Sequence, residues 1–334
     1  MEDGSSALEN VCEMMKLEKP YGLNAELEFA KTILASGQLK GCRPLSGIII
    51  GQPDTGKSET LMRFSQCEGI LVINDLTAYG LTKLIEDLRT AHHIIIPDLL
   101  RVLERSPRVA NELISMLNVM SEEGLLRIST YNTQLYLERP LRCAFLTSLT
   151  LEAFNRRRKR WRSIGFTSRA VPFFFGYNEE DLARARETIK RNEDVFKPVS
   201  LELKEPVEVN ISDDYANEVE KIAVFTGRIN EDFTAFRTLR NAIAMVKARA
   251  ALRGASEVEE EDIKFLRAMV PFWFNPILGN DCDYYIIHCL PARTGEIIKE
   301  LDGLYSERTI HYRLRELKER KVIIKKNGIW YTTY

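Results

Sequence analysis

The stretch Gly51-Gln52-Pro53-Asp54-Thr55-Gly56-Lys57-Ser58 decides the fold of this chain. An apolar run, 47–50, precedes it, and a predicted helix, 59–64, follows it. In a strand–loop–helix context the pattern G-x-x-x-x-G-K-[ST] is typical of loops that surround the phosphates of a nucleotide. Glycine lets backbone N–H groups turn toward phosphate oxygens, Lys57 reaches the β- and γ-phosphates, and Ser58 offers its hydroxyl to Mg²⁺. The residues predicted to bind the nucleotide are Gly51, Gln52, Pro53, Asp54, Thr55, Gly56, Lys57, Ser58 and Glu59.

Asp54 is the unusual residue of this predicted phosphate loop. A carboxylate that faced the phosphates would repel them. We therefore expect its side chain to point outward, and Asp tolerates the left-handed backbone conformation that this requires.

Composition excludes several classes of protein. The chain has 334 residues, 45% of them hydrophobic and 28% charged, which suits a soluble protein of about two or three domains. A formal net charge of −1 gives no overall attraction to nucleic acid, so any basic surface must be local. The six cysteines lack C-x-x-C spacing, which favours reduced thiols over disulfides or a zinc site. The acidic N-terminus and the absence of long apolar runs predict a cytoplasmic protein without signal peptide or membrane span.

Three further predicted strands, 69–74, 92–96 and 142–146, alternate with helices over 81–89 and 109–121. This alternation predicts an α/β fold with a parallel sheet. The third strand ends at Pro97-Asp98, where a carboxylate suits Mg²⁺, although an ordinary turn would look the same. The fourth strand delivers Thr147 and Ser148 to the carboxyl edge of the sheet, where ligands collect. Alternating runs on either side of Thr130-Tyr131-Asn132 predict a β-hairpin before it.

We predict three domains: a nucleotide-binding domain over 1–195, a helical domain over 207–272 and a small C-terminal domain over 276–334. The first boundary lies in the polar, proline-containing segment 178–206. The helical domain contains long apolar-striped helices over 232–253 and 257–269.

The C-terminal domain is predicted to be a winged helix-turn-helix. Helices over 294–301 and 306–320 precede two short runs around Asn327-Gly328, a strong hairpin signal. On the second helix an apolar face alternates with a polar face that would lie over a major groove of duplex DNA. Winged helices also bind proteins, and three glutamates dilute the positive charge of this one. The predicted DNA-binding residues are Arg308, His311, Tyr312 and Arg315 on the helix, with Lys325 and Lys326 on the wing.

The tract Arg156-Arg157-Arg158-Lys159-Arg160-Trp161-Arg162 concentrates six cations in seven residues. It suits a phosphate backbone or the acidic surface of a neighbouring subunit, and equally a solvated helix face. A nuclear-localisation signal is a weaker interpretation.

Together these motifs resemble the AAA+ ATPases, most closely the minichromosome maintenance (MCM) type. The resemblance covers roughly residues 20–334 and is most specific in the helices with Arg237-Thr238-Leu239 and 248–253. It implies an αβα P-loop domain with a helical lid, ATP with Mg²⁺, and a homo-oligomer. The roles that it implies are Lys57 on the phosphates, Ser58 and Asp98 at the metal, Thr147 as first sensor, Arg169 as a finger acting on the next subunit, and Arg237 as second sensor.

The chain also departs from that family. Pro97-Asp98-Leu99 replaces the adjacent acidic pair at the third strand, so that either the water-activating Glu is absent or Asp98 is itself the base. Both alternatives predict slow hydrolysis of ATP. The hairpin tip lacks the lysine of motor members, and no helix insertion or oligonucleotide-binding domain is expected, which argues against a processive helicase.

We therefore expect an ATPase that assembles on DNA, in replication initiation, factor loading or DNA remodelling. One alternative is a winged-helix transcriptional regulator in which ATP sets only the oligomeric state. Another is a protein-interaction scaffold.

Overall fold

A five-stranded parallel sheet forms the centre of the computed structural model, which describes residues 23–130, 133–174, 179–191, 197–201, 206–230, 232, 234–273 and 281–333. The strand order is β2-β3-β6-β1-β7, and every neighbouring pair is parallel. The predicted α/β fold is confirmed. The strands are β1 (Ser46–Gly51), β2 (Ile70–Val72), β3 (His93–Ile96), β6 (Ala144–Thr150) and β7 (Ala170–Phe174).

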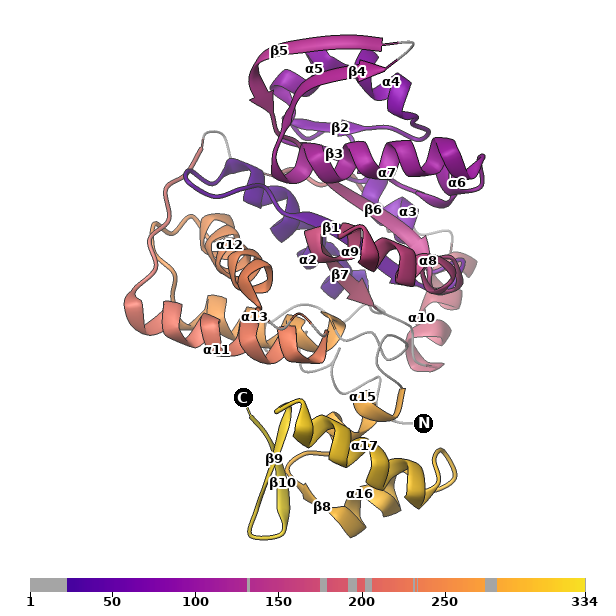
Figure 1. Cartoon of the computed structure of the whole chain (residues 1–334), viewed down its shortest axis with the longest axis vertical. Helices are drawn as coiled ribbons and strands as arrows, with labels where there is room; N and C mark the ends of the chain where they lie inside the picture. The colour runs from indigo at the N-terminus through magenta and orange to yellow at the C-terminus, as the bar shows by residue number, and fades with distance from the viewer. Residues whose placement is uncertain are drawn as a thin grey trace.

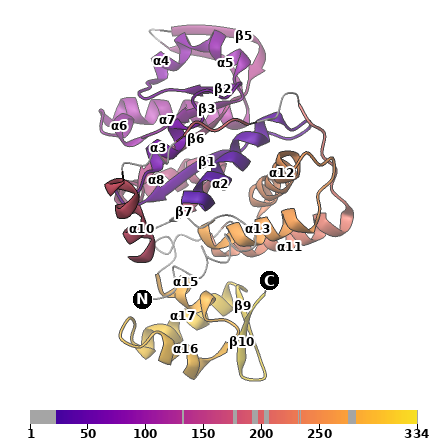
Figure 2. The same cartoon turned by 180° about the vertical axis from the view of Figure 1, so that it is seen from behind.

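Helices cover both faces of this sheet (Figures 1 and 2). Successive side chains of a strand point to opposite faces. In β1, Ile49 accordingly joins the hydrophobic core on one face, whereas Ile48 and Ile50 join the core on the other. Burial on both faces explains why the strands are continuous apolar runs. The helices of this part are α2 (Leu23–Ala35), α3 (Lys57–Met62), α4 (Ala78–Lys83), α5 (Ile85–Thr90), α6 (Leu100–Leu103), α7 (Pro107–Glu122), α8 (Leu151–Ser163), α9 (Phe166–Arg169) and α10 (Glu179–Lys190), with a 3₁₀ turn, η1 (Ser36–Gln38), after α2.

Two element boundaries differ from the sequence prediction. The single helix expected over 81–89 is two short helices, because the backbone leaves the helical region at Leu84 (φ −96°, ψ 15°). The strand expected over 142–146 begins at Ala144 and continues to Thr150, since 147–150 pair with β1 as its neighbour.

The predicted hairpin is present as β4 (Leu125–Thr130) and β5 (Thr133–Leu141), which pair antiparallel. It lies at the end of the molecule opposite the C-terminal helices (Figure 1). Tyr131 and Asn132 of its predicted tip lie outside the described residues.

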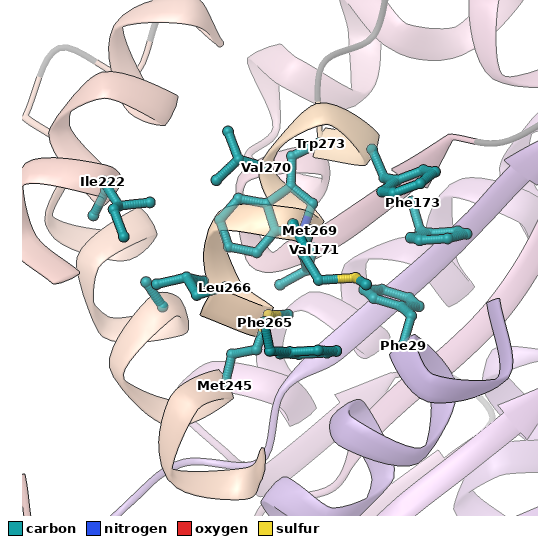
Figure 3. Close-up of a cluster of buried hydrophobic side chains, with 14 of the residues drawn as sticks. Phe29, Val171, Phe173, Ile222, Met245, Phe265, Leu266, Met269, Val270 and Trp273 are labelled. Atoms are coloured by element: carbon teal, nitrogen blue, oxygen red, sulfur yellow. The ribbon is translucent and has the colours of Figure 1, made fainter. Parts of the chain in front are cut away.

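A layer of three helices packs against one side of the sheet domain. These helices are α11 (Asp213–Ile229), α12 (Phe236–Leu252) and α13 (Glu260–Trp273), and they lie in the range predicted for the helical domain. The contact is aromatic: Phe173 of β7 stacks on Phe29 of α2 and on Phe272 of α13, with ring centroids 4.8 Å apart in both pairs. Figure 3 shows Phe173 and Phe29 close together, with Met269 of the helical layer beside them. This cluster joins the two parts into one core.

The C-terminal module contains the two predicted helices followed by a hairpin, and a further helix, which was not predicted, precedes them. The turn uses Asn327 and Gly328, both with positive φ (50° and 82°), as a two-residue hairpin turn requires. A two-residue strand, β8, pairs with β10 and was too short to predict. The elements are α15 (Asp281–His288), β8 (Ala292–Arg293), α16 (Thr294–Glu300), α17 (Glu307–Glu319), β9 (Ile323–Lys326) and β10 (Ile329–Thr332).

Ion pairs and backbone hydrogen bonds hold this module in place. Arg313 of α17 forms a two-point ion pair with the buried Asp283 of α15. Arg320, just after α17, donates to the carbonyls of Arg228 (3.0 Å) and Ile229 (2.6 Å) at the end of α11. Those carbonyls at the end of a helix carry partial negative charge, so a guanidinium is a suitable partner.

No helix among the described residues is long and apolar enough to cross a membrane.

The stacked aromatic cluster yields a stability prediction. Replacing Phe173 by Ala removes a fully buried ring from between Phe29 and Phe272, and such a cavity costs about 3–5 kcal/mol of unfolding free energy. Urea denaturation measures the loss. Phe236→Ala, at a 76% exposed position at the start of α12, serves as the control and should change stability by less than about 0.5 kcal/mol. Equal losses in the two variants would contradict the packing argument.

Candidate functional site

The 51–58 loop leaves β1 at Gly51 and enters α3 at Lys57. Two of its residues have left-handed backbone: Asp54 (φ 58°) and Gly56 (φ 79°). The expected left-handed conformation of Asp54 is confirmed, and the residue is exposed. The loop therefore has the backbone turns that an anion-binding concavity needs.

Lys57 is buried within this loop, with 7% of the residue exposed. Its ammonium group donates to the Gln52 carbonyl and, at 2.9 Å, to the Thr55 hydroxyl. Burial lowers the Lys57 pKa, and the charges of nearby carboxylates, Glu26 and Asp54 foremost, oppose that shift. The cation is thus held at the mouth of the loop.

The carbonyl group of Pro97, just after β3, connects this strand to the 51–58 loop by a hydrogen bond. The Ser58 hydroxyl donates to the Pro97 carbonyl at 3.1 Å, and the Ser148 hydroxyl donates to the same oxygen at 2.6 Å. Asp98 follows directly, and its carboxylate accepts the Leu100 N–H at 3.0 Å. The structure thus brings Ser58 and Asp98, the two predicted metal ligands, to one edge of the sheet.

These two oxygen donors suit a hard cation that keeps most of its ligands as water and phosphate, as Mg²⁺ does. Within the described part of the chain, no three His, Cys, Asp or Glu side chains come together to hold a metal ion by themselves. The residues present therefore fit Mg²⁺ bound together with a phosphate ligand.

Thr147 does not lie where the sequence placed it. It is fully buried inside β6, level with Ile48 of β1, and donates its hydroxyl to the Ile96 carbonyl at 2.7 Å. At about 3.3 Å per residue, Ile48 is roughly 10 Å along the strand from Gly51. The fourth strand does not end at Leu146, as expected, but continues to Thr150, so that Thr147 lies within the strand, level with Ile96 at the end of β3.

Glu26 of α2 is a buried carboxyl group beside the loop. It is 0% exposed, and neither carboxyl oxygen has a hydrogen-bond partner among the residues that the structure describes. Burial raises the pKa of Glu26 to about 8; the Lys57 charge opposes this rise and the Glu59 charge supports it. Glu26 is therefore protonated at neutral pH, and the charges that act on Lys57 there are those of Asp54, Asp98 and Glu59.

A second charged site lies at the opposite edge of the sheet. Its centre is Glu122, the last residue of α7, whose side chain is only 11% exposed. Burial alone would raise the Glu122 pKa, but hydrogen bonds from Arg240 and Arg237 and the charges around it lower it to about 2. Four arginines surround this carboxylate and form what we term the arginine cluster: Arg43, Arg169, Arg237 and Arg240.

The sheet keeps the arginine cluster away from the 51–58 loop. Arg169 immediately precedes Ala170, which pairs with Ser46 at the start of β1, whereas the loop begins at Gly51 at its end. Five residue steps at about 3.4 Å place the two edges roughly 17 Å apart. An arginine side chain is much shorter than that. The cluster therefore cannot touch a phosphate held by Lys57 of the same chain.

Arg169 does not extend freely from the surface. Its Nε lies 2.9 Å from Glu122 Oε2, its Nη1 donates to the Gly165 carbonyl at 2.9 Å, and 16% of the side chain is exposed. Arg237 likewise binds Glu122 with two nitrogens and donates to Ser168. In the single chain Arg169 does not reach outward as the expected finger would, because Arg169 and Arg237 are both paired with Glu122.

The predicted DNA-binding residues of the C-terminal module are all exposed. Ile310, Leu314 and Leu317 of α17 are buried, as predicted. Two of the exposed cations lie over aromatic rings: Arg315 over Tyr312 and Lys325 over Trp330. The exposed predicted residues are Arg308, His311, Tyr312, Arg315, Lys325 and Lys326.

The basic tract lies on α8, which begins where β6 ends. Arg156 pairs with Glu152 and Arg157 with Glu104, while Trp161 is buried against Phe154. Lys159 and Arg160 are exposed. Part of the tract is therefore a helix face with internal ion pairs.

Sequence reasoning missed Glu26, Glu122, Arg240 and Arg43. Glu26 could have been found, because it lies on the same helical stripe as the apolar Phe29, Ala30 and Ile33. Glu122 carries no such signal, since its four partners come from three distant segments.

No family model matches the chain, and no curated protein matches it in sequence. The geometry of the two edges is thus the basis for assigning a chemistry.

The buried Glu26 predicts that the unfolding free energy falls as the pH rises. The unfolded carboxyl ionises near its ordinary pKa of 4.5 and the folded one near 8. The folded state therefore binds more protons between these values, and unfolding free energy falls as pH rises through this window, by at most about 1.4 kcal/mol per unit. Urea denaturation at pH 5, 6, 7 and 8 measures it. Glu26→Gln should remove the fall, and the exposed Glu86→Gln should retain it. A Glu26→Gln profile parallel to the wild type would refute the assignment.

Proposed function

We propose that the chain is an AAA+ type, MCM-like ATPase with a helical lid (α11–α13) and a C-terminal winged helix, which assembles head to tail on DNA. One observation carries this proposal. A loop suited to phosphates and Mg²⁺ and a cluster of arginines occupy opposite edges of the same sheet. Neither edge has the full set of groups for phosphoryl transfer, but the two edges of adjoining copies together would have it.

The 51–58 loop would hold the triphosphate. Its backbone N–H groups and the Lys57 ammonium would bind phosphate oxygens, and Ser58 with Asp98 would hold Mg²⁺. The metal supplies neutralisation of the negative charge that spreads over the transferring phosphoryl group. Ser148 is better placed than Thr147 to report on this edge, because its hydroxyl shares the Pro97 carbonyl with Ser58.

Arg169 and Arg237 would act on ATP held by a neighbouring copy. Charge supplied in trans requires a heterologous interface, which closes into a ring or continues as a filament. The roughly 17 Å between the two edges of β1 supports this arrangement over action within one chain. Arginine fingers act by stabilising transition-state charge.

Hydrolysis by this site would be slow. Asp98 is followed by Leu99 and Leu100, and its carboxylate already accepts the Leu100 N–H. One carboxylate must then serve both metal binding and water activation. This observation favours the second candidate function, a DNA-binding transcriptional regulator in which ATP controls assembly with little or no turnover.

Duplex DNA would bind the exposed face of α17 and the β9–β10 hairpin. A helix presenting Arg308, Tyr312 and Arg315 beside a basic wing has the charge and shape for a major groove and its flanking phosphates. The chain as a whole supplies no overall attraction to DNA, because its formal net charge is −1.

A mixing experiment tests the ATPase proposal. Lys57→Ala should abolish ATP binding, and Arg169→Ala should keep ATP binding but lose turnover by about 10³-fold or more. A mixture of the two should regain turnover, because an intact loop then meets an intact arginine cluster. Steady-state phosphate release and solution mass with and without ATP are the measurements.

Three results would count against the proposal. Unchanged ATP affinity in Lys57→Ala would remove the phosphate site. A mixture no more active than its separate components would remove action between copies. ATP-dependent assembly without turnover, in the wild type as well, would favour the regulator.

DNA binding has a test of its own. Arg308→Ala and Arg315→Ala should each weaken binding to duplex DNA, and for each lost phosphate contact the slope of log affinity against log salt should fall by about 1. Lys299→Ala, which removes an exposed cation from α16 of the same module, should have no such effect. Fluorescence anisotropy over a salt series measures both quantities. Identical curves for all variants would assign this face to a protein partner.

A further inference from the structure

The arginine cluster holds more positive charge than its carboxylates neutralise. Four guanidiniums meet Glu122, and only one other carboxylate, the exposed Glu123 at 3.6 Å from Arg169, is paired with them in the described residues. Three of the four arginines are between 38% and 44% exposed: Arg43, Arg237 and Arg240. The cluster is therefore a surface with capacity for a further anion.

Glu122 uses both oxygens to fix these groups. Oε1 accepts from Arg237 Nε at 3.1 Å and from Arg240, and Arg43 lies 3.9 Å away from it. Oε2 accepts from Arg237 Nη2 at 2.9 Å and lies 2.9 Å from Arg169 Nε. Glu122 holds the planar guanidinium of Arg237 at two points, which leaves it little rotational freedom. The other three arginines meet the carboxylate at one nitrogen each. The carboxylate thus lies at the centre of the four positive charges.

The same carboxylate joins two parts of the fold. Arg169 comes from the edge of the sheet, whereas Arg237 and Arg240 lie one turn apart on α12 of the helical layer. Without the negative charge, these cations would repel one another at the junction. If Glu122 were removed, the arginines would lose the hydrogen-bonded partner that holds them in place.

We propose that Glu122 is a positioning residue that assembles Arg43, Arg169, Arg237 and Arg240 into a single receptor for the phosphate chain of ATP bound to an adjoining copy. Arg43 and Arg240 are then further phosphate-binding residues, next to Arg169 and Arg237. This inference rests on the proposed function. It adds that Arg169 acts on the neighbouring ATP only while the Glu122 carboxylate holds it beside Arg237 and Arg240 of the lid.

The test isolates the copy that donates the cluster. Arg169→Ala protein supplies an intact loop, and Lys57→Ala protein supplies an intact cluster without binding ATP. The donor is then changed to the double variants Lys57→Ala with Glu122→Gln, and Lys57→Ala with Arg240→Ala. Turnover of each mixture at saturating ATP should fall at least about tenfold relative to the Lys57→Ala donor, with little change in KM, because the acceptor's own loop is unchanged.

Glu28 offers a matched control. Its buried carboxylate also binds an arginine of α12, Arg249, at 2.6 Å, but on α2 rather than beside Arg169. A Lys57→Ala/Glu28→Gln donor loosens the same helical layer and leaves the arginine cluster intact, so its turnover should stay within about twofold. Circular dichroism melts confirm that each donor is folded, and Arg240→Ala, at an exposed position, tests the receptor even where Glu122→Gln fails to fold.

The outcomes separate the two claims. Full activity with the Glu122→Gln and Arg240→Ala donors would overturn this inference while the proposed function stands. An equal loss with the Glu28→Gln donor would reduce Glu122 to a structural contact. An inactive mixture with the parent Lys57→Ala donor would overturn both.

Discussion

The parallel pairing of β1 with β6 and β7 is the constraint on which the rest of the structure depends. Because β1 runs from Ser46 to Gly51 between two parallel neighbours, everything that follows a strand lies at one edge, and everything that precedes a strand lies at the other. The 51–58 loop and Asp98 follow strands, whereas Arg169 precedes one. Hydrogen bonding of the sheet thus separates, within one copy, the two groups of residues that the proposed function brings together.

Each edge is organised by one oxygen-bearing group. At the carboxyl edge the Pro97 carbonyl accepts from Ser58 and Ser148, which links the loop to two strands. At the amino edge the Glu122 carboxylate binds arginines from α9, just before β7, and from α12. Buried polar groups must be satisfied, and satisfied ones fix geometry. Assembly of copies would then join two rigid half-sites rather than order two loose ones.

Glu26 links the stability of the fold to the 51–58 loop, because it is buried beside Lys57. Its burial beside Lys57 keeps Glu26 protonated at neutral pH. The unfolding free energy therefore falls at higher pH, where this buried group must ionise beside the loop that carries Lys57. Groups that work against folding in this way are common at functional sites.

The sequence by itself determined what depends on local pattern: the loop and its left-handed Asp54, the alternation that makes a parallel sheet, the apolar face of α17 and the Asn327-Gly328 turn. Turn chemistry and hydrophobic period act over a few residues, so they are readable without a structure. The tertiary structure alone decided that Thr147 is buried, that Arg169 is paired within its own chain, and that Glu122 gathers four arginines. Strand length and ion-pair partners depend on segments distant in sequence, since Arg43, Glu122, Arg169 and Arg240 meet only after the sheet and α12 have packed together.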